Sequence, residues 1–190
     1  MANRPYLQGI YNWAEGNISY LSNPIAVVLT ASGYTANTGA SGDQYLSAIV
    51  SGNRVAVSGD LSSKTDSGGM LDAADLVFSS VTGSVVTQYE LFWNSGTDST
   101  SYLLWQFDTA TNLPMSPNGG NITIQWPSTP PYILSLYGAL ADNDKRLVDR
   151  YGWRNLVRWI REWGIPVDRR SKGGLWTPVP ALVQSPPSLG

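Results

Sequence analysis

The stretch from residue 85 to residue 126 constrains the fold of this chain more than any other. Apolar and polar side chains alternate along three runs within it, at residues 85–94, 102–108 and 121–126. A period of two places successive side chains on opposite faces of a β-strand. The connections between these runs contain Asn-Ser-Gly and Asn-Gly-Gly, residue types that adopt the backbone angles of tight turns. The stretch therefore predicts antiparallel strands joined by turns, with their aromatic side chains filling a core.

Further strands are predicted on both sides of this stretch. Residues 25–29 form a continuous apolar run that fits a strand buried on both faces. Shorter strand-like runs occupy residues 54–58, 76–81 and 132–136. Seven or eight short strands between residues 24 and 137 predict a mainly β fold, an antiparallel β-sandwich.

Three other segments of the body give weaker predictions. Residues 45–50 have the spacing of a single helical turn. Residues 60–71 are predicted to form a polar loop, because they include Ser-Gly-Gly and few apolar side chains. No helix or strand is predicted before Pro24.

The architecture is predicted to change at Gly138. From residue 142 to residue 163, apolar and charged side chains take helical spacing, and Gly164 with Pro166 ends the pattern. Residues 165–190 contain five prolines and are predicted to form an extended arm that cannot build a core of its own. The chain thus divides into a β-sandwich body (1–137), an amphipathic helix (138–164) and a Pro-rich arm (165–190).

The predicted helix carries a row of five arginines, and the charge of the chain is unevenly distributed. Residues before 141 include three basic and nine acidic side chains, whereas residues from 141 onward include nine basic and five acidic ones. Neighbouring arginines on a helix repel one another, and an acidic protein surface would pair with them. A solvated helix face explains the spacing equally well, and nucleic acid or a membrane surface are further alternatives.

We predict an acidic protein surface as the partner of this segment, and neither nucleic acid nor a membrane. Aromatic and arginine side chains dominate the energetics of protein interfaces. The predicted partner-binding residues are Arg146, Arg150, Arg154, Arg158, Trp159, Trp163, Trp176 and Leu182.

The chain contains no histidine and no cysteine. This composition excludes disulfides and removes the commonest zinc ligand and the usual general base. Glu90 and Asp108 lie on neighbouring predicted strands and could form a glycosidase-type carboxylate pair, although solvent-facing charges explain them equally well. Asp142-Asn143-Asp144 lacks the glycine and glutamate of a calcium loop. We therefore predict no enzymatic activity, no metal and no cofactor.

The first residues lack the basic and apolar parts of a secretory signal, and no window of about 18 apolar residues could span a membrane. We therefore expect the protein to be synthesised in a cytoplasm.

Several segments in order resemble a family of small virion structural proteins of tailed bacteriophages. The most specific of them is Leu-Pro-x-x-Pro-Asn-Gly-Gly at residues 113–120. The others are residues 25–29, 33–35, 54–59, 72–78, 108–114 and 117–126. The similarity covers about residues 1–136 and brings no catalytic motif. It implies a compact β protein attached to the particle, and capsid decoration as its role.

Family members end soon after the last strand, whereas this chain continues for about 54 residues. The resemblance therefore does not define how this protein would dock. We predict a decoration or cement protein of the virion, made in the host cytoplasm, that binds the major capsid protein or another virion protein and neighbouring copies of itself. A neck or tail component is the alternative location.

A carbohydrate-binding adhesion module is a second hypothesis. Exposed aromatic rings stack on sugar rings, and the candidates are Tyr89, Trp93, Tyr102 and Trp105.

Overall fold

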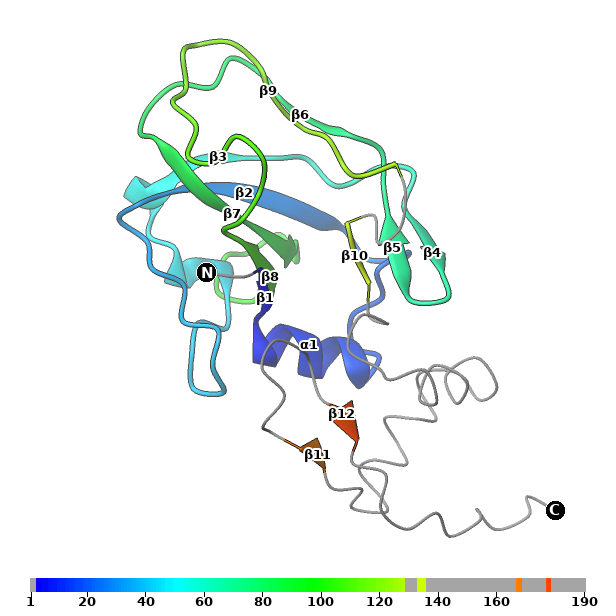
Figure 1. Ribbon diagram of the computed structural model, residues 1–190. Helices are drawn as coiled ribbons and strands as arrows, with labels where there is room; N and C mark the ends of the chain where they lie inside the picture. Colours follow the sequence, from blue (N-terminus) through cyan, green and yellow to red (C-terminus); the bar gives the residue numbers. More distant parts are fainter. Residues whose placement is uncertain (1–2, 129–132, 136–166, 169–176, 179–190) are drawn as a thin grey trace, which may run out of the picture.

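A five-stranded antiparallel sheet forms the centre of the molecule, with the strand order β1-β8-β7-β2-β3. The computed structural model describes residues 3–128, 133–135, 167–168 and 177–178 (Figure 1). The strands of this sheet are β1 (Arg4–Pro5), β2 (Ile25–Ala31), β3 (Arg54–Val57), β7 (Val86–Trp93) and β8 (Leu103–Phe107). The prediction of a mainly β protein with antiparallel sheets is confirmed.

Strand β2 is the predicted apolar run, and all seven of its residues are buried. Ile25, Val27 and Leu29 belong to the larger of two apolar clusters, whereas Ala26 and Val28 belong to the smaller. Alternate residues of a strand point to opposite faces, so the clusters lie on the two sides of the sheet. We refer to these sides as the Ile25 face and the Val28 face. The prediction that this strand is buried on both faces is confirmed.

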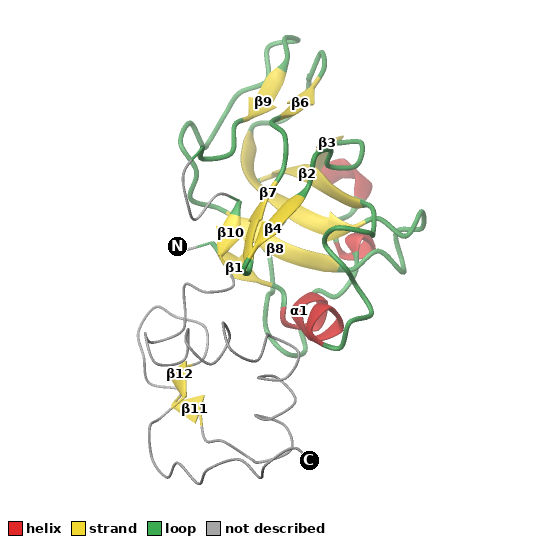
Figure 2. Ribbon diagram, turned by 90° about the vertical axis from the view of Figure 1, so that its right-hand side faces the viewer, coloured by secondary structure: helices red, strands yellow, loops and turns green. Residues whose placement is uncertain are grey.

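Two smaller sheets cover the Ile25 face (Figures 1 and 2). One pairs β6 (Leu76–Phe78) with β9 (Ile122–Ile124), and the other has the order β10-β5-β4. Its strands are β4 (Thr65–Ser67), β5 (Met70–Asp72) and β10 (Leu134–Ser135). The buried side chains that these sheets add to the larger cluster are Leu71, Phe78, Ile122, Ile124 and Leu134.

The aromatic core predicted for the central stretch lies on the Ile25 face. Tyr89 stacks on Phe107 with ring centroids 4.8 Å apart, and the Trp126 ring lies 6.3 to 6.4 Å from both. All three side chains are at most 8% exposed. These rings fill the space between the central sheet and its cover, as predicted.

In the described part of the chain, the Val28 face is not covered by a second sheet. Loops and short 3₁₀ turns cover it, and their buried side chains are Tyr6, Tyr34, Leu46 and Ile49. The turns span Leu46–Ala48 and Ser51–Asn53, which agrees with the helical turn predicted near residues 45–50.

Two predictions about local structure are wrong. Helix α1 (Leu7–Ala14) and strand β1 precede Pro24, where no element was expected. No side chain caps the amino terminus of the helix, and Gly9 lies inside it, so the usual helix signals are missing. A Cβ atom at Gly9 would lie 2.0 Å from the Leu103 carbonyl oxygen, which shows that the helix packs directly on the backbone of β8.

The second error is the predicted loop at residues 60–71. It contains the hairpin of β4 and β5, whose turn uses the positive φ angles of Gly68 and Gly69. This hairpin is one reason why nine strands, β2 to β10, lie in the described part of residues 24–137 rather than seven or eight.

The predicted amphipathic helix and most of the Pro-rich arm lie outside the described residues. Within the arm, β11 (Val167–Asp168) and β12 (Thr177–Pro178) are described and pair antiparallel with each other.

Candidate functional site

The eight predicted partner-binding residues, from Arg146 to Leu182, all lie outside the described residues. The structure instead shows where the chain leaves the body. Strand β10 pairs with Met70 and Leu71 of β5, and the Ile133 amide donates a hydrogen bond to the Leu71 carbonyl at 3.0 Å. The carboxyl-terminal segment therefore starts beside the β4–β5 hairpin.

Acidic side chains lie on and beside the hairpin next to which the chain leaves the body. Three carboxylates form what we call the acidic hairpin surface: Asp66 and Asp72 on the hairpin strands, and Asp75 just after them. Asp66 accepts a hydrogen bond from the Gly69 amide, and Asp75 accepts one from the Trp126 amide. These contacts orient Asp66 and Asp75, and a group of carboxylates at one place can attract a basic partner.

Nearby groups are consistent with a negative potential at this surface. Burial raises the pKa of the Tyr20 hydroxyl, and the charges of Asp72 and Asp66 raise it further. Lys64 lies in the same segment, and its ammonium donates to the Asn23 carbonyl. Partial burial lowers the pKa of Lys64 and the charge of Asp60 raises it, so this cation lies near Asp60.

Glu90 is a buried acid at the centre of the sheet, which the sequence did not predict. Its side chain is 0% exposed on the Val28 face, and the Thr30 hydroxyl lies 3.0 Å from one carboxyl oxygen and 3.3 Å from the other. Burial raises the pKa of Glu90 to about 8, the Thr30 hydrogen bond lowers it, and the charge of Asp43 raises it. At neutral pH the carboxyl group is therefore largely protonated.

A hydrogen-bonded network connects the surroundings of Glu90 to the loops that cover it. The Tyr34 hydroxyl donates to Asp43 at 2.8 Å and lies 3.0 Å from the Tyr6 hydroxyl. Burial raises the pKa of both tyrosines, so they stay protonated and act as hydrogen-bond donors. The network fixes the entry segment and the loop at residues 34–43 against the sheet.

Two glutamines extend the polar contacts on this face. The Gln106 side chain donates to the Gln88 side-chain oxygen at 2.9 Å, and Gln88 donates to the Tyr34 carbonyl at 3.3 Å.

The proposed carboxylate pair does not form an open site. Glu90 has no solvent exposure, so the interpretation of this residue as a solvent-facing charge is wrong, and a substrate could not reach it in this structure. Asp108 follows β8, where its backbone amide donates to the Asn3 side chain at 3.1 Å. Within the described ranges, no group of three or more acidic residues is arranged to hold a metal ion.

Three partly exposed aromatic rings form a row at the end of β7 and β8. The Trp93 and Tyr102 rings stack with centroids 6.1 Å apart and an interplanar angle of 10°. The Tyr45 ring lies 4.7 Å from that of Tyr102, and their hydroxyls are 3.3 Å apart. We call these three residues the aromatic row. The other two rings considered for sugar stacking, Tyr89 and Trp105, are each only 8% exposed, so that prediction is wrong for them.

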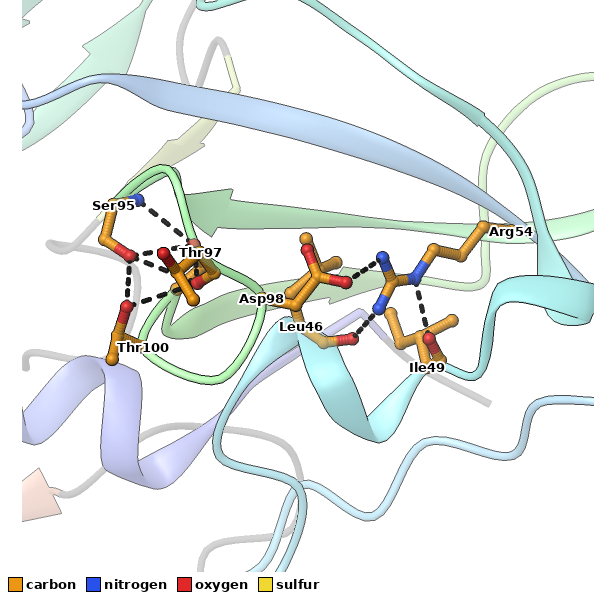
Figure 3. Close-up of polar contacts among 8 residues, drawn as sticks. Leu46, Ile49, Arg54, Ser95, Thr97, Asp98 and Thr100 are labelled. Atoms are coloured by element: carbon orange, nitrogen blue, oxygen red, sulfur yellow. Dashed lines mark hydrogen bonds and ion pairs between the residues drawn. The ribbon is translucent and has the colours of Figure 1, made fainter.

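The loop at residues 94–101 connects Trp93 to Tyr102 and is rich in hydroxyl groups. Figure 3 shows the Ser95 hydroxyl between the Thr97 carbonyl, at 3.2 Å, and the Thr100 hydroxyl, at 2.6 Å. Ser101 closes the loop by donating to the Thr97 carbonyl at 2.9 Å. These internal bonds give the loop a defined shape.

Arg54 fastens this loop to the 3₁₀ turns. Its guanidinium donates to the Asp98 carboxylate at 2.6 Å and to the backbone carbonyls of Ile49 and Leu46 at 2.6 and 2.8 Å (Figure 3). All three nitrogens of this side chain are therefore engaged.

A search of known protein families finds no match for this chain, and neither does a search of curated proteins. The resemblance to phage virion proteins therefore remains a prediction. In the part of the chain that the structure describes, no helix is long and apolar enough to cross a lipid bilayer.

Proposed function

We propose that this protein is a non-enzymatic structural component of a bacteriophage virion and that it decorates the assembled capsid. The resemblance of residues 1–136 suggests this role. The β body is compatible with it, because both faces of the central sheet are covered and Glu90, a fully buried acid among the described residues, is sealed from solvent. Such a body can serve as a rigid unit on a particle surface.

The position where the chain leaves the body is the observation that carries the proposal. Strand β10 places the start of the carboxyl-terminal segment beside the acidic hairpin surface. Residues from 141 onward carry nine basic and five acidic side chains, whereas residues before 141 carry three basic and nine acidic ones. On a lattice of identical copies, the basic segment of one copy would meet the acidic surface of the next, since opposite charges steer and align such contacts.

In this proposal the partners are the major capsid protein, or another virion protein, and neighbouring copies. The arginines from Arg146 to Arg158 set the register of the contact, while Trp159, Trp163, Trp176 and Leu182 supply apolar anchors. Each contact can be weak, because copies held on one particle have a high effective concentration.

A truncated protein tests this role of the carboxyl-terminal segment. Deletion of residues 141–190 should leave the β body folded, because the described core clusters contain no residue beyond Leu134. Particles assembled with the truncated protein should lack it after purification. Normal occupancy of the particles by the truncated protein would refute the role of this segment.

A matched pair of variants tests whether the positive charge of the four arginines is needed for binding to the particle. Replacing Arg146, Arg150, Arg154 and Arg158 together by Gln should lower the number of copies per particle, whereas replacing them by Lys keeps the charge and should lower it less. Equal occupancy for the Gln variant and the wild type would contradict the assigned function of the arginines.

A neck or tail location is the alternative for the same structural role. The number of copies per particle distinguishes the two, because a decoration protein follows the copy number of the capsid lattice and a neck or tail component is far less abundant.

A further inference from the structure

We propose that the aromatic row, Trp93, Tyr102 and Tyr45, binds a neutral pyranose sugar at the end of the central sheet. This binding surface is separate from the acidic hairpin surface and does not depend on the virion role. The proposal rests on the exposure of the rings, on the polar loop beside them and on the charges around them.

The rings are positioned by the pairing of their strands. Trp93 lies opposite Tyr102, whose carbonyl accepts the Trp93 amide at 2.9 Å, and Tyr45 forms a bridge with Tyr102 on its other side. All three side chains stay partly exposed, unlike the buried rings of Tyr89 and Phe107 on the same two strands. The result is an aromatic surface whose position is fixed by backbone hydrogen bonds and which solvent still reaches.

A row of this kind suits the chemistry of a pyranose ring. One face of the sugar presents C–H groups that pack on an aromatic ring, while its hydroxyls point outward around the edge. Binding sites for small molecules combine apolar and aromatic walls with a few placed polar groups. The Tyr45 hydroxyl adds one such group within the row itself.

The loop at residues 94–101 supplies further polar groups at the border of the row. It begins directly after Trp93 and ends directly before Tyr102, and it contains Asn94 and several hydroxyl side chains. The Leu46 amide donates to the Ser101 carbonyl at 2.8 Å, and the Ser47 amide donates to the Asp98 carbonyl at 3.1 Å. A loop held from both sides loses little freedom when a ligand binds, which favours affinity.

The charges at this end of the sheet do not favour an anionic sugar. Two described cations lie near the loop. Arg54 binds Asp98 and two carbonyls through its three nitrogens, and Lys64 donates to the Asn23 carbonyl and interacts with the charge of Asp60. Each cation therefore already has an acidic partner, Asp98 or Asp60, and offers an anionic sugar little unpaired positive charge. Asp60 accepts a hydrogen bond from the Asn94 side chain at 3.2 Å, and the described charges near the loop are paired, so they give a sugar carboxylate no advantage over a neutral sugar.

The test follows the Trp93 indole resonance of the full-length, ¹⁵N-labelled protein during titration. The neutral probes are tetrasaccharides of β-1,4-linked glucose, α-linked mannose and β-1,4-linked N-acetylglucosamine, and the anionic probe is tetragalacturonate. Trp93→Phe keeps an aromatic ring and assigns the resonance. We expect a saturable shift with at least one neutral probe and a weaker response, or none, with tetragalacturonate.

Two variants then test whether sugar binding depends on the aromatic row or on another part of the surface. Tyr45→Ala should weaken binding by about fivefold or more, the order expected when one aromatic contact is removed. Tyr45 belongs to neither apolar cluster, so this variant should fold. Tyr11→Ala removes a 56% exposed tyrosine on α1 and should bind like the wild type.

Three results would each overturn the proposal. The first is that no neutral probe shifts the Trp93 resonance. The second is that Tyr45→Ala binds as tightly as the wild type, and the third is that tetragalacturonate binds more tightly than every neutral probe.

Discussion

Replacing the buried Glu90 by Gln should make the folded protein more stable near neutral pH and remove a large part of its pH dependence. Gln has almost the same shape, cannot ionise, and can keep a hydrogen bond with Thr30. The prediction follows from the position of Glu90, which has no solvent exposure.

The sign and size of the effect follow from proton linkage. Glu90 has a pKa of about 8 in the folded state, compared with 4.5 for an unperturbed carboxyl group. Between these two values the folded state binds more protons than the unfolded state, so the free energy of unfolding falls as the pH rises. From about pH 5 to about pH 7 this single group removes roughly 2 kcal/mol. Below its unfolded-state pKa the contribution is fully present, and it is lost by the time the pH passes through 8.

Urea unfolding at several pH values between 5 and 8, followed by far-UV circular dichroism, measures the effect. The Glu90→Gln variant should match the wild type near pH 5 within about 1 kcal/mol and exceed it by roughly 2 to 3 kcal/mol at pH 7. Asp60→Asn is the matched control, because Asp60 is exposed and Asn can still accept the hydrogen bond from Asn94.

A second variant should increase the pH dependence of stability that Glu90→Gln removes. The Thr30 hydrogen bond lowers the pKa of Glu90, so Thr30→Val should raise this pKa and extend the loss of stability above pH 8. If Glu90→Gln has the same pH dependence as the wild type, Glu90 is charged inside the folded protein, and the reasoning about its burial is refuted.

Three further variants test the packing of the body by urea unfolding. Gly9→Ala should destabilise the protein by about 2 kcal/mol or more, because the new methyl group would meet the Leu103 carbonyl; an unchanged midpoint would show that α1 does not rest on β8. Tyr34→Phe removes the hydrogen bond to Asp43 and should cost about 1 to 2 kcal/mol, whereas a neutral effect would mean that this network does not hold the loop. Arg54→Lys keeps the charge but not the three-way hydrogen bonding, so it should cost about 1 kcal/mol; full stability would contradict its fastening role.

The central strands were predictable because their signals are local. Residues 25–29 are apolar without interruption, and the alternation around Tyr89, Trp105 and Trp126 correctly predicts rings that fill the Ile25 face. The turn residues between the strands were also informative, since Gly96 and Gly119 have positive φ angles, as tight turns require.

The elements that were missed depend on contacts between distant parts of the chain. Helix α1 includes Gly9, which weakens a helix by itself, and the benefit of that glycine appears only when the helix packs on β8. The β4–β5 hairpin has few apolar side chains, and Leu71 alone of its residues is an apolar side chain fully buried in the core. Its pairing with β10 could not be inferred from its own sequence.

The burial of Glu90 was missed because the alternation of apolar and polar side chains was interpreted as a sheet with one solvent-exposed face. The central sheet is covered on both sides, so Gln88 and Glu90 of β7 are buried as well. The uninterrupted apolar run at residues 25–29 of β2 was the available signal, because the neighbour of a fully buried strand must lie in the same enclosed layer of the sheet.

A cryo-electron microscopy reconstruction of the native particle tests the central claim most directly. It should show the β body at regular positions on the capsid, with the segment that follows β10 contacting the acidic hairpin surface of a neighbouring copy. A particle with a bare capsid surface and no density for this body at any vertex, neck or tail position would contradict the account.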